Sequence, residues 1–141
     1  MQYVCDAGTK TWFRFETEQE AALESRAMSH AVEKYFKQAQ DEAVRIYVPP
    51  KSAQYIEQNI GLKAHLQKAM PRFLTLRDAE GNALVTAMLP PEGEDEKSFR
   101  PIIVGAENTD PYAEHAEAIQ ALAKHYGFTL DPVRCYPYRR D

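Results

Sequence analysis

The sequence predicts an α+β fold, a mainly antiparallel sheet with three helices packed on one face of it. Two observations support this: β-rich runs joined by short turns indicate hairpins, and apolar residues spaced three or four apart indicate amphipathic helices. The expected order is ββαβαβββαβ, and the 141 residues fit one domain covering residues 1–141. The alternative is a three-layer α/β arrangement, which needs parallel strands joined by right-handed crossovers.

The first third of the chain predicts a hairpin followed by a long helix. Residues 3–5 and 10–15 are rich in β-formers and flank turn chemistry around Gly8. Thr17 and Glu20 then have the spacing of a capping box. The apolar stripe that follows, which includes Tyr35 and Phe36, predicts one amphipathic helix of about 24 residues with both rings buried.

The middle of the chain predicts a strand and an interrupted helix. Residues 44–48 are β-rich and stop at a diproline, which cannot continue a helix. Ser52 is the expected cap of the next helix. A glycine after Asn59-Ile60 is typical of a helix C-terminus, so we expect a break at Gly61 and a short helix over residues 62–69.

The last half predicts a second hairpin, a strand, a third helix and a final strand. Residues 72–77 and 83–89 flank a turn in which Gly81 takes the left-handed position. A strand over residues 99–104 follows. Asp110 and Pro111 then open a helix that ends at Gly127 and buries Ile119 and Leu122. Residues 128–130 are the expected last strand.

Charge and composition disfavour several classes of protein. The net charge is −4, and most of it comes from the acidic segment 90–98, interpreted as a solvated loop. The rest is close to neutral, so nucleic-acid binding is unlikely, since it requires clustered Lys and Arg. We expect no membrane contact and, without a secretory signal, a cytoplasmic protein whose Cys5 and Cys135 are reduced thiols.

No catalytic or ligand-binding motif is present. The six glycines are isolated, so neither common nucleotide loop occurs, and no cysteine has a zinc-ligand spacing. We therefore expect no metal and no cofactor. His30 and Glu33 are interpreted as an exposed helical pair. If the chain is an enzyme without a signature motif, the candidate catalytic residues are His115, Tyr112 and Cys135.

The C-terminal tail is the candidate partner-binding segment. Tyr136, Tyr138, Arg139 and Arg140 are residue types enriched at interfaces. We expect a non-enzymatic binding or regulatory domain: an inhibitor, an immunity-like protein or a complex subunit. A protein partner is expected, and a homo-oligomer is left open. The alternatives are the small enzyme and, second, single-stranded nucleic-acid binding through the tail.

Overall fold

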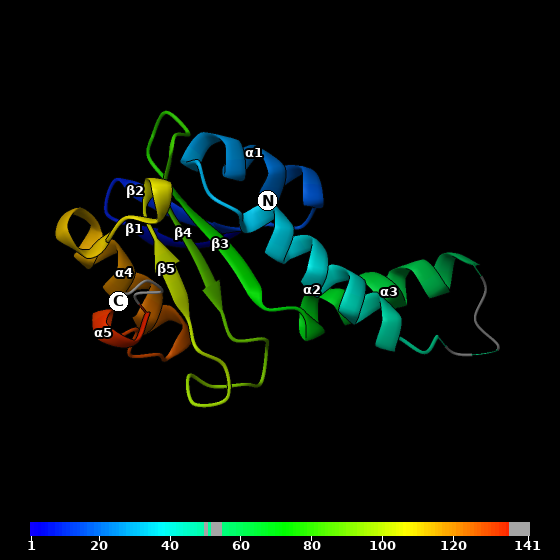
Figure 1. The fold of residues 1–141 in the computed structure, drawn as a ribbon. Helices are drawn as coiled ribbons and strands as arrows, with labels where there is room; N and C mark the ends of the chain where they lie inside the picture. Colours follow the sequence, from blue (N-terminus) through cyan, green and yellow to red (C-terminus); the bar gives the residue numbers. More distant parts are fainter. Residues whose placement is uncertain (50, 52–54, 136–141) are drawn as a thin grey trace.

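The structure is a computed structural model that describes residues 1–49, 51 and 55–135. At its centre is one antiparallel sheet with the strand order β1-β2-β3-β4-β5 (Figure 1). The strands are β1 Gln2–Ala7, β2 Lys10–Arg14, β3 Arg72–Arg77, β4 Ala83–Leu89 and β5 Ile102–Val104. The α+β prediction is therefore confirmed, whereas the alternative with parallel strands is wrong for this sheet.

Both predicted hairpins are present. Gly8 and Gly81 have φ values of +69° and +85°, the left-handed conformation that these turns require. In the second turn, the Asp78 carboxylate accepts the backbone N–H groups of Glu80 and Asn82 at 3.0 and 2.9 Å. This turn sets the register that places Thr75 opposite Thr86.

The helices differ from the prediction in number and position. They are α1 Glu18–Met28, α2 Val32–Ile46, α3 Tyr55–Ala69, α4 Tyr112–Tyr126 and the short α5 Pro132–Cys135, with a 3-10 turn η1 Ala106–Asn108. They cover both faces of the sheet, rather than one, because α4 lies on the face opposite α1 and α2.

The long first helix of the prediction is in fact two helices. The Thr17–Glu20 capping box is confirmed, with the Thr17 hydroxyl accepting the Glu20 N–H at 3.2 Å. The helix then ends at Ser29, whose φ of 53° is left-handed. The Ser25 hydroxyl accepts the Glu33 N–H at 2.8 Å and so caps the start of α2. A local polar contact therefore turns the chain where the apolar stripe alone predicts continuation.

Three further predictions are wrong. Residues 44–48 are not a strand, because α2 continues to Ile46. The predicted break at Gly61 is absent, since α3 runs through it. The expected Ser52 cap lies outside the described residues. Here Gly61 serves a close approach: a Cβ at this position would lie 2.5 Å from the Tyr47 hydroxyl. Residues 128–130 form no strand, and Leu130 has a φ of 50°.

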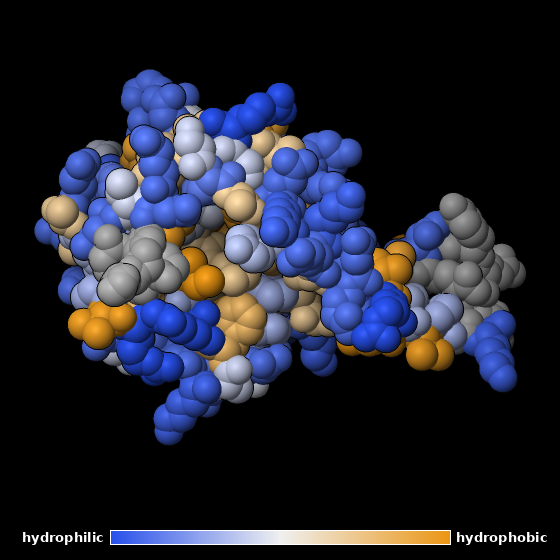
Figure 2. All heavy atoms as spheres, viewed as in Figure 1, coloured by the Kyte–Doolittle hydropathy of each residue, from blue (hydrophilic) through white to orange (hydrophobic). Residues whose placement is uncertain are grey.

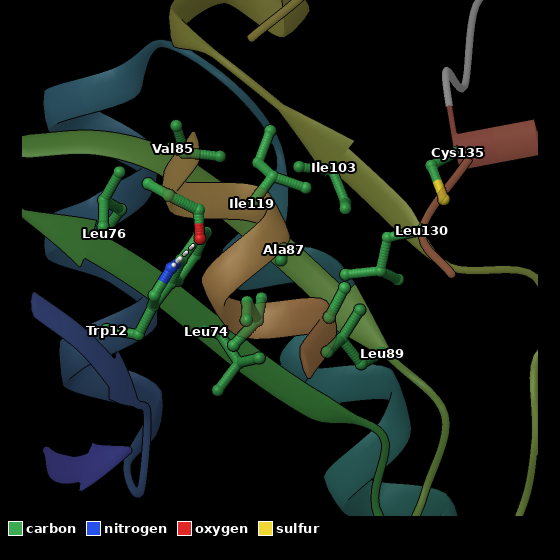
Figure 3. Close-up of a cluster of buried hydrophobic side chains, with 13 residues drawn as sticks. Trp12, Leu74, Leu76, Val85, Ala87, Leu89, Ile103, Ile119, Leu130 and Cys135 are labelled. Atoms are coloured by element: carbon green, nitrogen blue, oxygen red, sulfur yellow. Dashed lines mark hydrogen bonds between the residues drawn. The ribbon is translucent and has the colours of Figure 1, made fainter. Parts of the chain in front are cut away.

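The core on the α4 face is built from every second strand residue. The strand side chains of this core lie around Ile119 of α4 (Figure 3) and are at most 1% exposed: Trp12, Leu74, Leu76, Val85 and Ile103. Leu122 of α4 belongs to the same core and is also fully buried. The indole N–H of Trp12 donates to the Ala118 carbonyl at 2.8 Å, so the largest buried side chain also has its polar atom satisfied. The predicted burial of Ile119 and Leu122 is confirmed.

The opposite face of the sheet carries α1 and α2. Phe15, Phe36, Phe73 and Met70 form its core, and the rings of Phe36 and Phe73 meet edge to face at 5.1 Å. Phe36 is buried as predicted. Tyr35 is 52% exposed, so its predicted burial is wrong. Adjacent residues of a helix point about 100° apart, so Phe36 faces the sheet while Tyr35 lies outside the buried stripe.

Helices α2 and α3 form a hairpin that projects away from the sheet (Figure 1). We call its described residues 40–49, 51 and 55–66 the arm. Two contacts hold its helices together: His65 Nε2 lies 2.9 Å from the Ala43 carbonyl oxygen, and the rings of Tyr47 and His65 are 5.0 Å apart. These two contacts lie in the described part of the arm, which extends away from the body of the protein.

Candidate functional sites

A buried polar chain joins α1 to the sheet. Glu24 is fully buried on α1, in the same stripe as Ala21 and Met28. Its carboxylate accepts a hydrogen bond from Arg77 Nη2 at 2.8 Å and another from the Thr86 hydroxyl at 2.5 Å. Burial raises the pKa of Glu24, and the hydrogen bonds from Thr86, Thr75 and Arg77 offset part of this effect.

This series of buried hydrogen bonds ends at His30, in the corner between α1 and α2. His30 Nε2 lies 2.8 Å from the Thr86 hydroxyl oxygen. Because that hydroxyl already donates to Glu24, Nε2 carries the proton and Nδ1 is free to accept. Nδ1 faces the backbone N–H of Val32, at 3.4 Å, in the first turn of α2. Burial lowers the pKa of His30, so the neutral imidazole is the favoured form.

A pocket of about 340 Å³ opens beside His30. Its remaining lining comes from α2, the sheet and η1: Ala31, Val32, Tyr35, Phe73, Thr86, Ala87, Met88, Ile102, Val104 and Asn108. We call it the His30 pocket. Most of its wall is apolar, and the buried hydrogen-bonded network reaches it through His30 and Thr86. Apolar cavities with a few placed polar groups are typical of ligand sites.

Sequence reasoning missed this site because its members are far apart in the chain. The interpretation of His30 and Glu33 as an exposed helical pair is wrong, since His30 lies between the helices and bonds to a residue 56 positions away. One signal was available: Thr75 and Thr86 occupy inward positions of their strands. A polar residue on a buried strand face needs a buried partner.

The structure brings together two of the three predicted catalytic residues. The Tyr112 hydroxyl donates to the Leu130 carbonyl at 2.8 Å and interacts with the Cys135 thiol. Burial raises the pKa of Cys135 to about 11 and also raises the pKa of Tyr112. Both groups therefore stay protonated at neutral pH, which does not favour nucleophilic chemistry. Cys5, like Cys135, is a free thiol.

His115 lies apart from that pair, against the β1–β2 turn. Lys10 Nζ lies 3.2 Å from His115 Nδ1, so the ammonium donates to a neutral imidazole. Burial, followed by the charge of Lys10, lowers the pKa of His115. A polar hollow of about 490 Å³ separates this turn from the start of α4. The three candidates thus occupy two places, not one site.

The predicted partner-binding residues Tyr136, Tyr138, Arg139 and Arg140 lie outside the described residues. Their role stays a prediction.

The arm presents a different candidate surface. Four of its large apolar residues are exposed: Val44, Ile46, Val48 and Ile60, at 45%, 52%, 84% and 66%. Figure 2 shows hydrophobic residues along the projecting part of the molecule, among charged ones. We call these four residues the arm patch. Helix pairs normally bury such residues against each other or against a core, so their exposure needs an explanation.

The described residues hold neither a metal-binding cluster nor a membrane-spanning helix. Across residues 1–49, 51 and 55–135, no three His, Cys, Asp or Glu side chains are grouped to hold a metal ion. No helix in that part of the chain is long and apolar enough to cross a membrane.

The fold and these surfaces define an antiparallel α+β domain with a projecting helical arm. No protein-family model matches the chain, and no curated protein or solved structure is significantly similar to it.

Proposed function

We propose that this chain is a non-enzymatic domain that binds another protein in the cytoplasm, as an inhibitor, an immunity-like partner or a complex subunit. The arm is its docking element. The observation that carries the proposal is the arm patch, four large apolar side chains exposed on an element whose own helices are held together by His65.

The arm suits protein docking because it projects from the body and its two helices contact each other. Large apolar side chains that gather on the exposed surface of a folded protein mark interaction sites. Burying a Val or Ile side chain contributes roughly 1.5–3 kcal/mol, so two or three of them supply a useful affinity. An amphipathic helix laid on a partner is a common recognition mode, and both helices of the arm carry exposed apolar side chains.

The polar surroundings favour a specific partner over unspecific association. On α2, Glu42 and Arg45 form an exposed ion pair one turn apart, next to Val44 and Ile46. Charged residues at the rim of an apolar patch govern orientation and exclude wrong partners more than they add affinity.

The experiment places a photo-crosslinking amino acid at Ile46 or Ile60 in the cells that make the protein. The matched control position is Asp41, which is exposed on the same helix. We expect adducts of one mass from positions 46 and 60, and little from position 41. The adduct should be lost when Val44 and Val48 are replaced by Ser. An adduct with twice the mass of the chain identifies the partner as a second copy.

Two results would contradict the proposal. One is equal labelling at positions 41, 46 and 60, since the arm patch would then attract no particular protein. The other is a large loss of thermal stability in the Val44→Ser, Val48→Ser variant, because exposed residues contribute little to folding.

A further inference from the structure

We propose that the His30 pocket binds a small, uncharged and mainly apolar molecule that carries one hydrogen-bonding group. The pocket lies against the sheet and is separate from the arm patch, so this inference does not depend on the proposed function.

The pocket exists because helices leave part of one sheet face uncovered. On β5, Ile103 points into the core under α4, while Ile102 and Val104 point to the other face. Helices α1 and α2 cover β2, β3 and part of β4 on that face, but β5 is the edge strand. An apolar floor formed by Met88, Ile102 and Val104 is left open to a ligand.

The lining sets the charge and size of the ligand. None of its residues is Asp, Glu, Lys or Arg. A charged ligand would have to lose its water shell without a compensating partner, which is costly. The volume of about 340 Å³ lies at the lower end of the range for small-molecule sites. An uncharged molecule of one or two rings fits both constraints.

The residues of the lining that carry polar side-chain atoms are His30, Tyr35, Thr86 and Asn108. His30 and Thr86 are fixed by their bonds to Val32, Glu24 and each other, so they form a rigid wall. Asn108, in η1, is exposed, and its amide has no hydrogen-bond partner among the described residues. A carboxamide both donates and accepts. It is therefore the group we assign to the polar atom of the ligand.

The test uses two probes with the same ring system. 2-Naphthol is uncharged at neutral pH, whereas 2-naphthoate carries a carboxylate. Titration of the purified protein is followed by the methyl NMR signals of Met88, Ile102 and Val104, with Ile119 and Leu122 as internal controls in the other core. We expect saturable shifts at the first three with 2-naphthol, and binding of 2-naphthoate weaker by about tenfold or more.

A matched pair of variants tests the assigned polar group. Residues 107 and 108 both have left-handed backbone, with φ of 58° and 60°, so glycine suits either position. Asn108→Gly removes the amide, and Glu107→Gly relaxes the same turn without changing the pocket lining. We expect roughly fivefold weaker 2-naphthol binding for the first variant, the worth of one hydrogen bond, and no change for the second.

Three results would overturn the inference. The first is the absence of saturation at millimolar 2-naphthol. The second is a set of shifts spread equally over both cores. The third is equal affinity for the two probes or for the two variants.

Discussion

At the scale of single residues, the charged Glu24–Arg77 pair is the most consequential feature. The Glu24 side chain is fully buried and that of Arg77 is 19% exposed. Little water could therefore solvate either charge if the other were removed. A buried pair contributes little net stability, but removing one partner leaves the other charge uncompensated. The two residues are thus far more sensitive to substitution than a surface pair.

We therefore predict that Arg77→Ala lowers the free energy of unfolding by about 3–5 kcal/mol, because it leaves the buried Glu24 carboxylate without a counter-charge. Glu24→Gln, which keeps the shape without the charge, is expected to cost less. Urea unfolding measures both. Glu42→Gln, in the exposed Glu42–Arg45 pair, is the control and should have no measurable effect. Equal effects of Arg77→Ala and Glu42→Gln would show that Glu24 is well solvated.

The lowered pKa of His30 predicts a pH dependence of stability. Below the ordinary value of 6.5, the unfolded chain binds a proton at this position that the folded chain does not. The free energy of unfolding then falls as the pH drops from about 6.5 toward the folded pKa. His115, whose pKa is also lowered, acts in the same direction, whereas Glu24, with a raised pKa, acts in the opposite one above pH 4.5.

His30→Gln retains a donor for Thr86 but does not titrate. We expect the free energy of unfolding of this variant to fall less steeply between pH 6.5 and 5 than that of the wild type. The difference in slope should correspond to at most one proton taken up on unfolding. Urea titrations at several pH values measure this slope. His115→Gln should give a separate, similar decrease. If the slope is unchanged in His30→Gln, His30 is as solvated in the folded state as in the unfolded chain.

At the scale of elements, the acidic segment between β4 and β5 does more than connect them. It was expected to be a solvated loop, and several of its residues are exposed. Glu96, however, accepts the backbone N–H groups of Thr129 and Leu130 at 2.7 and 2.9 Å, just after α4. Its backbone carbonyl also accepts a hydrogen bond from Arg134 at 2.7 Å. The Glu96 carboxylate therefore stabilises a turn at residues 129–130, where the sequence predicts a strand.

Glu96→Ala should therefore lower the free energy of unfolding by roughly 1–3 kcal/mol, since it removes a charged acceptor from two amides. Glu94→Ala, in the same loop and exposed, should leave stability unchanged. Denaturant midpoints of the two variants make the comparison. Equal midpoints would indicate that water replaces Glu96 at these amides without loss.

Elements were predictable from the sequence where local chemistry decides them, and not where a distant contact does. The Thr17–Glu20 cap and the two hairpins depend on residues within a few positions of each other. The β-rich residues 44–46 are helical because α2 packs against α3, through contacts such as Ala43–His65 that span 22 positions. The polar chain at His30 spans 56 to 62 positions, and only the inward threonines hinted at it.

At the scale of the whole molecule, one sheet carries two cores. The α4 face contains Trp12, the single tryptophan of the chain, while the α1–α2 face contains Phe36. Because both cores use the same strands, neither can persist when the sheet is lost. We predict that the body unfolds in one cooperative step.

Trp12 fluorescence and far-UV circular dichroism should accordingly give coincident urea transitions. Leu122→Ala and Phe36→Ala, on opposite faces, should each shift both signals together, with losses of about 2–5 kcal/mol. If Leu122→Ala moves the fluorescence transition alone, the two faces unfold separately.

The position of the arm in the chain has an evolutionary consequence. Strands β2 and β3 are direct neighbours in the sheet, yet α1, α2 and α3 all lie between them in sequence. The hairpin leaves the body and returns to it, so its length does not affect strand register. The entropy of closing such an excursion grows slowly, by about 0.6 kcal/mol for each doubling. Lengthening, shortening or replacing the distal arm would thus leave the scaffold intact, and selection can change the surface of the arm without rebuilding the sheet that holds it.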